Sequence, residues 1–358
     1  MTLRIGILGA ARISGQAIVD PARATGDRLV AVAARDPARA KDFAAAHQVE
    51  RVVGSYPELV AAPEVDVVYN PLANAFHGPW NVEAVQAGKH VLTEKPFASN
   101  ASEARAVRDA AAAAGVTIVE GFHYVHHPVA LRLRSLVESG ALGTIVRIET
   151  HFRMPAPPDS DPRWQLDLAG GATMDLGCYA LHLHRFLGSS PRVVAARAGE
   201  RAGHPGVDEW LEADLLHADG VTGLAHAHMA SDHWRITCKV IGSRGEALAH
   251  NIVLPQQDDR VTVSIDGRER TEHLGTRSTY THQLEALGAH LRDGLHHSLG
   301  VGERQRRALR QGARAEPAPR LVFGQRGEQH AAHGRAIGRQ AGAGHQRDRH
   351  HLPLRGAG

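Results

Sequence analysis

The N-terminal residues 1–14 constrain the fold most, because they predict a buried strand that leads through a tight turn into a helix. Leu3 to Ala10 form a nearly continuous apolar run, typical of a strand in a parallel sheet covered on both faces. The turn, Gly9 to Ser14, occupies the positions of the G-x-G-x-x-G dinucleotide motif but keeps only its first glycine. That glycine permits the turn, and the alanine and serine in the other positions are small enough for a diphosphate and for helix packing. We therefore predict a dinucleotide-binding βα unit.

A second apolar run, Arg28 to Ala34, ends where an adenosine ribose would be bound. Enzymes that use NAD usually carry an acid near this point for the ribose 2′-hydroxyl, whereas here the run is followed by Arg35 and Asp36. A guanidinium could instead hold a 2′-phosphate and stack on adenine. We expect NADP(H) in preference to NAD(H), which stays possible; the alternative is an ordinary exposed arginine beside an acid.

Three more apolar runs, at residues 65–69, 90–93 and 116–120, extend the predicted parallel sheet, with helices expected at 37–47, 80–87 and 99–114. In such sheets, ligands bind at the carboxyl ends of the strands. Asn74 and His77 follow the third strand and are candidates for a cofactor loop or for helix capping. The candidate cofactor-binding residues are Gly9, Ala10, Ala11, Arg12, Ile13, Arg35, Pro71, Leu72, Asn74, His77, Glu94 and Lys95.

Lys95 follows the fourth predicted strand and is one of four lysines among 41 basic residues. A lysine kept among so many arginines invites a chemical explanation, because an ammonium can change its pKa when desolvated, whereas a guanidinium stays charged. We expect Lys95 to lie where a nicotinamide ring meets a substrate alcohol. An exposed loop lysine is the alternative.

From Thr144 onward the pattern changes to strands that alternate polar and apolar residues, which is typical of an antiparallel sheet with one solvated face. Within this region, Asp175, Tyr179 and His182 would share one face of a helix that begins near Asp175. His123, Arg163 and Trp164, together with His182, are candidates for substrate binding. His123, His126 and His127 have no cysteine or carboxylate at ligand spacing beside them, so we expect no metal site.

The basic residues are concentrated at the C-terminal end. Residues 295–358 hold twelve arginines, no lysine and four acidic residues, a net charge of +8, so the first 294 residues carry −5 of the chain's total of +3. Nucleic-acid binding by the body of the chain is therefore not expected. The composition of the tail indicates disorder or, as we favour, a slipped reading frame. The two unpaired cysteines and the lack of a signal peptide or long apolar run predict a cytoplasmic protein without a membrane segment.

Several segments resemble the glucose-fructose oxidoreductase, inositol dehydrogenase and rhizopine-catabolism (Gfo/Idh/MocA) family. They are GILGAARIS, VAARD, TEKPFA, EGFHYVHHP, GGATMDLGCYALH, GVDE and VIGSRGEA, and the resemblance extends over residues 1 to about 294. Tyrosine in the D-x-G-C-Y segment makes the chain most similar to the dimeric dihydrodiol dehydrogenase and NADP-linked D-xylose dehydrogenase branch. Val125 replaces an arginine common in the family, and Ala169 replaces the first glycine of its GGGA run.

The resemblance implies a doubly wound Rossmann domain at residues 1–122, an α+β domain with an open, mainly antiparallel sheet at 123–294, and dimerisation through that sheet. It also implies NAD(P)-dependent hydride transfer to or from a sugar, polyol or dihydrodiol-type alcohol, with Lys95 and Tyr179 as the catalytic pair and Asp175 close by. We expect the Lys95 ammonium to lower the pKa of the Tyr179 phenol. The alternative is an inactive NADP-binding sensor or scaffold with the same fold.

Overall fold

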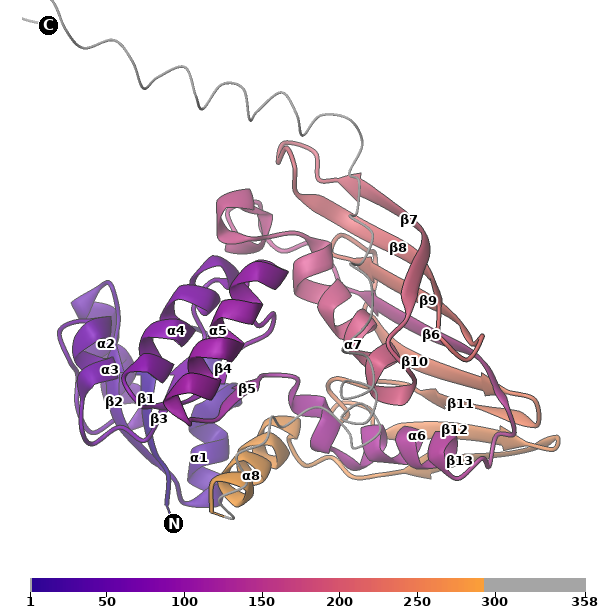
Figure 1. The fold of residues 1–358 in the computed structure, drawn as a ribbon, viewed down its shortest axis with the longest axis horizontal. Helices are drawn as coiled ribbons and strands as arrows, with labels where there is room; N and C mark the ends of the chain where they lie inside the picture. The colour runs from indigo at the N-terminus through magenta and orange to yellow at the C-terminus, as the bar shows by residue number, and fades with distance from the viewer. Residues whose placement is uncertain (1, 293–358) are drawn as a thin grey trace, which may run out of the picture. The chain divides into compact units, whose positions relative to one another are not determined.

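The computed structural model describes residues 2–292 of the 358-residue chain and contains two β-sheets within them (Figure 1). The predicted tail, residues 295–358, lies outside the described residues. The fold class predicted from the sequence is confirmed, because a parallel sheet is followed by a mainly antiparallel one.

The first sheet has five parallel strands in the order β2-β1-β3-β4-β5. The chain adds β2 on one side of β1 and β3 on the other, so the connections diverge at the carboxyl ends of β1 and β3. In open α/β sheets this divergence opens a crevice for ligands. The strands are β1 (Arg4–Leu8), β2 (Arg28–Ala33), β3 (Val67–Asn70), β4 (His90–Thr93) and β5 (Ile118–Glu120).

Helices cover both faces of this sheet, which explains why its strands are apolar throughout. Val67 and Tyr69 face one hydrophobic core, and Val68 between them faces the other. The first core includes residues of the π-helical turn η1 (Gly15–Val19) and the helices α1 (Asp20–Thr25), α2 (Pro37–His47) and α8 (Thr279–Arg292). The second core includes residues of α3 (Tyr56–Ala61), α4 (His77–Gln86) and α5 (Ala101–Ala114).

Helix α8 was not predicted, and it returns to the first sheet. Tyr280, Leu284 and Leu287 are buried in the same core as the strands β1, β3 and β4. The segment predicted as a second domain, 123–294, therefore does not pack as one body, since its last described helix lies in the core of the first.

The second sheet has eight strands in the order β13-β12-β11-β10-β6-β9-β8-β7, and only β6 and β9 pair in parallel. Helices α6 (Pro128–Glu138) and α7 (Cys178–Leu187) cover one face, and no described helix covers the other (Figure 1). The strands are β6 (Ile145–Arg153), β7 (Arg192–Glu200), β8 (Asp208–Leu216), β9 (Thr222–His228), β10 (Arg235–Gly242), β11 (Gly245–Ala249), β12 (Arg260–Ile265) and β13 (Arg268–His273).

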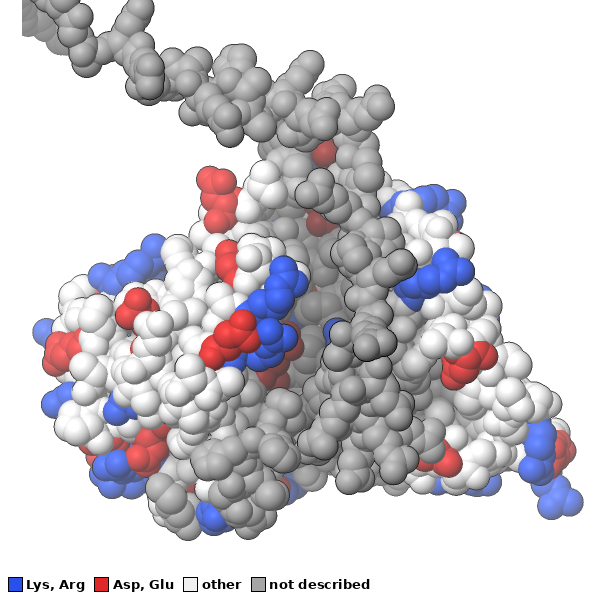
Figure 2. All heavy atoms as spheres, in the orientation of Figure 1, with Lys and Arg blue, Asp and Glu red and all other residues white. Residues whose placement is uncertain are grey.

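Charged side chains of both signs are interspersed over the described part of the face in Figure 2. Of the helices within residues 2–292, none is both long enough and apolar enough to cross a membrane.

Candidate active site

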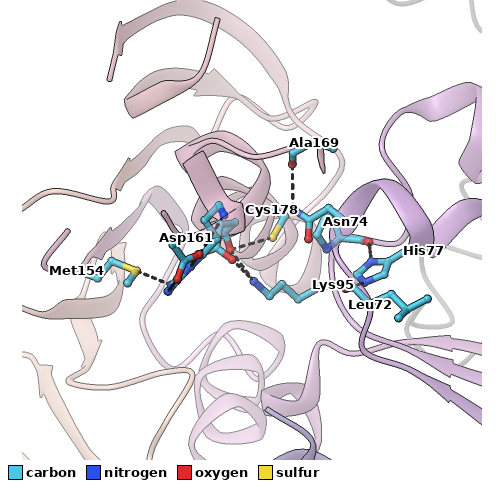
Figure 3. Close-up of polar contacts among 11 residues, drawn as sticks. Leu72, Asn74, His77, Lys95, Met154, Asp161, Ala169 and Cys178 are labelled. Carbon is cyan, nitrogen blue, oxygen red and sulfur yellow. Dashed lines mark hydrogen bonds and ion pairs between the residues drawn. The ribbon is translucent and has the colours of Figure 1, made fainter. Parts of the chain in front are cut away.

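Lys95 lies directly after β4 and forms a buried ion pair with Asp175, 80 residues further along the chain. Its Nζ donates to the Asp175 Oδ1 at 2.7 Å and to the Asp175 main-chain oxygen at 2.9 Å (Figure 3). The two side chains are only 14% and 13% exposed. Asp175 belongs to the π-helical turn η6 (Thr173–Gly177), which leads into α7. The pair thus joins the carboxyl edge of the first sheet to the helix that covers the second.

The surroundings of Lys95 keep its ammonium protonated. Burial by itself would lower the pKa of Lys95, but the negative charge of Asp175, with smaller contributions from Cys178 and Glu94, outweighs burial and raises it. Lys95 is therefore a cation throughout the neutral pH range.

Tyr179 lies one helical turn after Asp175, and its ring faces the Lys95 ammonium. The Lys95 Nζ is 5.0 Å from the centre of the Tyr179 ring, a cation–π contact. Burial raises the pKa of Tyr179 well above its ordinary value, and neighbouring groups including Tyr280 and Glu94 raise it further. The pKa of Tyr179 is thus raised overall rather than lowered, because burial disfavours the phenolate while the Lys95 ammonium pairs with Asp175.

Arg163 belongs to the same polar cluster but is held mainly by Asp161. Its Nε and Nη2 donate to the two carboxylate oxygens of Asp161, each at 2.9 Å. Its Nη1 lies 3.8 Å from the Asp175 Oδ2 and 3.8 Å from the Met154 sulfur (Figure 3). The two positive charges of this cluster, Lys95 and Arg163, are thus both compensated by carboxylates.

His123 lies beside this cluster as a neutral imidazole. Its Nδ1 is 2.7 Å from the Thr279 Oγ1, and its ring stacks on Tyr280 with centroids 3.9 Å apart. Burial lowers the pKa of His123 to about 3. The residue can therefore offer a hydrogen bond but does not carry a charge near neutral pH.

Two of the residues predicted to bind substrate, Trp164 and His182, lie outside the cleft. Trp164 is buried in the core of the second sheet and donates its indole N–H to the Pro157 carbonyl at 3.2 Å. The His182 ring stacks on Phe122, and its Nδ1 is 2.6 Å from the Tyr124 hydroxyl. Asp175 lies in a π-helical turn, so the face that an ideal α-helix would extend from Asp175 to His182 is not continuous.

Two adjoining pockets run along the carboxyl edge of the first sheet, with volumes of about 1080 and 810 Å³. Every candidate cofactor-binding residue lines at least one of them. The larger pocket is lined by Gly9, Ala10, Ala11, Arg35, Pro71 and Leu72 of that set. The smaller is lined by Ala11, Arg12, Ile13, Pro71, Leu72, Asn74, His77, Glu94 and Lys95, together with His123, Arg163, Asp175 and Tyr179.

The larger pocket has the features that a dinucleotide requires. Gly9 has a φ of +87°, and a Cβ there would lie 3.0 Å from the Leu72 side chain, so the turn depends on glycine. Arg35 and Arg39 both line the pocket. The carboxylate of Asp36 instead accepts a hydrogen bond of 2.9 Å from the Ala38 N–H and caps α2. The residues at the tip of β2 therefore fit an anionic ribose substituent.

Asn74 and His77 connect loops as well as lining the smaller pocket. The Asn74 amide donates to the Ala169 carbonyl at 2.9 Å, and the His77 ring nitrogens lie 2.7 and 2.8 Å from the carbonyls of Pro96 and Leu72 (Figure 3). Burial lowers the pKa of His77. These contacts hold the loops after β3 and β4 together.

The sequence did not single out several lining residues, namely Arg39, Asp161, Phe152, Trp234 and Tyr280. Arg39 was detectable, because it lies in the first turn of the helix predicted at 37–47, directly after the segment that holds Arg35. The others come from loops, from β6 and from α8, which only the fold brings to the cleft. Within residues 2–292, no three histidine, cysteine or acidic side chains are grouped so that they could hold a metal ion.

Comparison with known proteins assigns both parts of the chain to one family. Residues 3–122 match the oxidoreductase family with an NAD-binding Rossmann fold, and residues 130–248 match the GFO/IDH/MocA C-terminal domain. The chain is 34% identical over 297 residues to D-xylose 1-dehydrogenase (NADP(+)) 2 from Haloferax volcanii, covering 82% of this chain and 90% of that protein. It is 32% identical over 276 residues to a dTDP-3,4-didehydro-2,6-dideoxy-alpha-D-glucose 3-reductase from Saccharopolyspora spinosa, covering 76% and 82% of the two chains.

Solved structures agree with these sequence matches. A 3-ketoreductase from Actinomadura kijaniata, in complex with NADP and TDP-benzene, superposes with a TM-score of 0.78 at 26% identity, over 87% of this chain and 95% of that one. The resemblance noted in the sequence is thus confirmed over both sheets. The chain belongs to the GFO/IDH/MocA family of NAD(P)-dependent oxidoreductases.

Proposed function

We propose that this enzyme uses NADP(H) to interconvert a secondary alcohol and a ketone on a sugar, polyol or dihydrodiol-type substrate. The observation that carries the proposal is the cluster of Lys95, Asp175 and Tyr179, which lines the smaller of the two adjoining pockets. The names of the relatives support the substrate class, since they include a D-xylose dehydrogenase, a deoxysugar 3-reductase and a trans-1,2-dihydrobenzene-1,2-diol dehydrogenase from Xenopus laevis.

A bound nicotinamide cofactor would supply or accept the hydride. The protein then has to handle the proton on the substrate oxygen. Lys95 and Tyr179 both carry a proton near neutral pH, because the pKa of each is raised. Either group can therefore donate to an oxygen that becomes an alcohol, and the Lys95 ammonium stabilises negative charge that develops there. Asp175 holds the Lys95 Nζ in position.

The catalytic proposal is tested with Lys95→Met and Tyr179→Phe. Each should lower turnover by roughly 10² or more, because each removes a proton-transfer group, while NADP(H) affinity changes little. The matched controls are Lys239→Met and Tyr124→Phe. In the wild type the Lys239 ammonium pairs with Glu246, and the Tyr124 hydroxyl contacts His182 outside the pocket. Near-normal turnover in both active-site variants would contradict the proposal.

Preference for NADP(H) is supported by the guanidiniums of Arg35, after β2, and Arg39, in the first turn of α2, and by the capping role of Asp36. An acid engaged in capping a helix is a poor partner for a ribose 2′-hydroxyl, whereas Arg35 and Arg39 suit a 2′-phosphate. Comparing kcat/KM for the two cofactors tests this, and a clear preference for NAD(H) would contradict it.

We also propose that the protein forms a homodimer through the second sheet and is located in the cytoplasm. The face of that sheet without a described helix carries polar pairs such as Arg147–Glu149 and Lys239–Glu246. Sedimentation at assay concentration tests the dimer, and a monomer there would contradict it.

A further inference from the structure

Trp234 is an exposed aromatic side chain at the open end of the candidate substrate pocket. It lines the same pocket as Lys95 and Tyr179, yet 60% of it is exposed to solvent. A large exposed aromatic ring on the wall of a cleft offers a surface on which a ligand ring can stack.

An apolar wall connects Trp234 to the reacting centre. Tyr179 stacks on Phe152 with ring centroids 5.6 Å apart and planes inclined by 8°. Phe152 on β6 is paired with Ile236 on β10, and Trp234 precedes Ile236 by two residues. All four side chains line the pocket, so the wall runs from Tyr179 out to solvent.

Among the residues that the structure describes, those on the polar side of this pocket leave no uncompensated positive charge at its substrate end. Lys95 pairs with Asp175, and Arg163 pairs with Asp161. The remaining cation that lines the pocket among the described residues, Arg12, belongs to the turn after β1 and lies near the Asp161 carboxylate, whose pKa it helps to lower. A diphosphate placed at this end would therefore meet carboxylates without a free cation to offset its charge.

We propose that the cleft takes an uncharged two-ring substrate, whose reacting ring lies at Lys95 and Tyr179 and whose second ring stacks on Trp234. A disaccharide or a glycoside with a neutral aglycone has this chemistry. The inference rests on the proposed function for the reacting ring, but the second subsite stands on the position and exposure of Trp234. Among the substrate types named for the relatives, it excludes nucleotide-linked sugars as the preferred ligand.

The experiment compares D-xylose, xylobiose and dTDP-glucose by calorimetric titration of the enzyme saturated with NADP(H), with turnover of the two neutral sugars measured in parallel. D-xylose and xylobiose share a free anomeric centre and differ by one uncharged ring. Wild-type protein should bind xylobiose about tenfold more tightly than D-xylose, and dTDP-glucose no more tightly than xylobiose. Trp234→Ala should remove the advantage of xylobiose and leave D-xylose binding within about twofold, since only the second ring touches the indole.

Trp234→Phe keeps a ring and should retain most of the advantage. Leu166→Ala, at a side chain that is 57% exposed and lines neither pocket, is the control for loss of exposed apolar surface and should behave as wild type. The subsite would be overturned if the wild type bound both sugars with equal affinity or did not bind xylobiose. It would also be overturned if Trp234→Ala lowered the affinity for both sugars equally. Tighter binding of dTDP-glucose than of xylobiose would overturn the proposal that the preferred substrate is uncharged. The expected affinities without turnover would support the subsite while refuting the proposed function on these sugars.

Discussion

The ion pair between Lys95 and Asp175 should be energetically coupled in a double-mutant cycle. With Nζ and Oδ1 2.7 Å apart and side chains 14% and 13% exposed, each partner depends on the other for charge compensation. Removing one partner of a buried pair costs about 3–5 kcal/mol, because the other charge stays buried without it. Lys95→Met and Asp175→Asn together leave neither charge, so the double variant should be more stable than additivity predicts, by about 2 kcal/mol.

The two single variants should differ. After Lys95→Met, Asp175 still has the Arg163 guanidinium 3.8 Å from its Oδ2. After Asp175→Asn, the Lys95 ammonium keeps the main-chain oxygen but loses the largest influence that raises its pKa, while burial still lowers it. We therefore expect Asp175→Asn to destabilise the protein more than Lys95→Met does.

The assay is urea unfolding of the wild type, both single variants and the double variant, with the free energy of unfolding measured between pH 7 and 9. A lysine whose pKa is raised on folding contributes stability that is fully present below its unfolded pKa of about 10.4 and is lost as the pH rises through the folded value. The contribution of Lys95 to the stability of the wild type should therefore be constant over this range, whereas the cost of Asp175→Asn should become smaller as the pH rises, because burial favours the neutral amine once the carboxylate is gone. Additive effects, or a larger cost for Lys95→Met than for Asp175→Asn, would refute the reasoning.

Two further predictions concern other parts of the cleft. Arg35→Ala should lower kcat/KM with NADP(H) by about tenfold or more and leave kcat/KM with NAD(H) nearly unchanged, since a charge-assisted contact to the 2′-phosphate is lost; equal losses with both cofactors would contradict this. Burial raises the pKa of Glu120 to about 7, above its unfolded value near 4.3, so the unfolded state releases its proton first and stability should fall as the pH rises from about 4 to 7. Glu120→Gln keeps an acceptor for the Phe97 N–H, which lies 2.8 Å from the Glu120 Oε1. This variant should be more stable than wild type at pH 8, by at most about 4 kcal/mol, but not at pH 4.5. If the unfolding free energies of Glu120→Gln and the wild type differ by the same amount at pH 4.5 and pH 8, the prediction is contradicted.

Local patterns predicted most of the strands because burial leaves a periodic signal. The doubly covered sheet produced continuous apolar runs, as at Leu3 to Ala10, and the second sheet produced alternation. Two strands escaped prediction. Strand β13 (Arg268–His273) is an exposed edge made only of polar residues, and β11 (Gly245–Ala249) consists largely of glycine and alanine, which favour strands weakly. Neither carries the apolar alternation that a sequence pattern needs.

Residue types were a weaker guide to the site than strand ends were. Candidates placed at the carboxyl ends of strands, such as Gly9, Arg35 and Lys95, line the pockets, because the topology of a parallel sheet brings all those ends to one edge. Trp164 and His182 were chosen because their side chains suit a polyol, yet they pack elsewhere. His123 and Arg163, chosen on the same grounds, do line the smaller pocket, so suitable chemistry by itself did not decide location.

Residues near one another in the chain set the order of the elements, the two kinds of sheet, the glycine turn and the strand end that carries Lys95, so these could be predicted from local patterns. The pairing of Lys95 with Asp175, the raised pKa of the buried Tyr179 and the place of Trp234 at the end of an apolar wall follow from the folded arrangement. Charge and burial act through distances in space, and the residues that set them come from different domains. Lys95 is accordingly an ammonium held by a carboxylate, which is a different state from the phenol-activating cation that the sequence predicted.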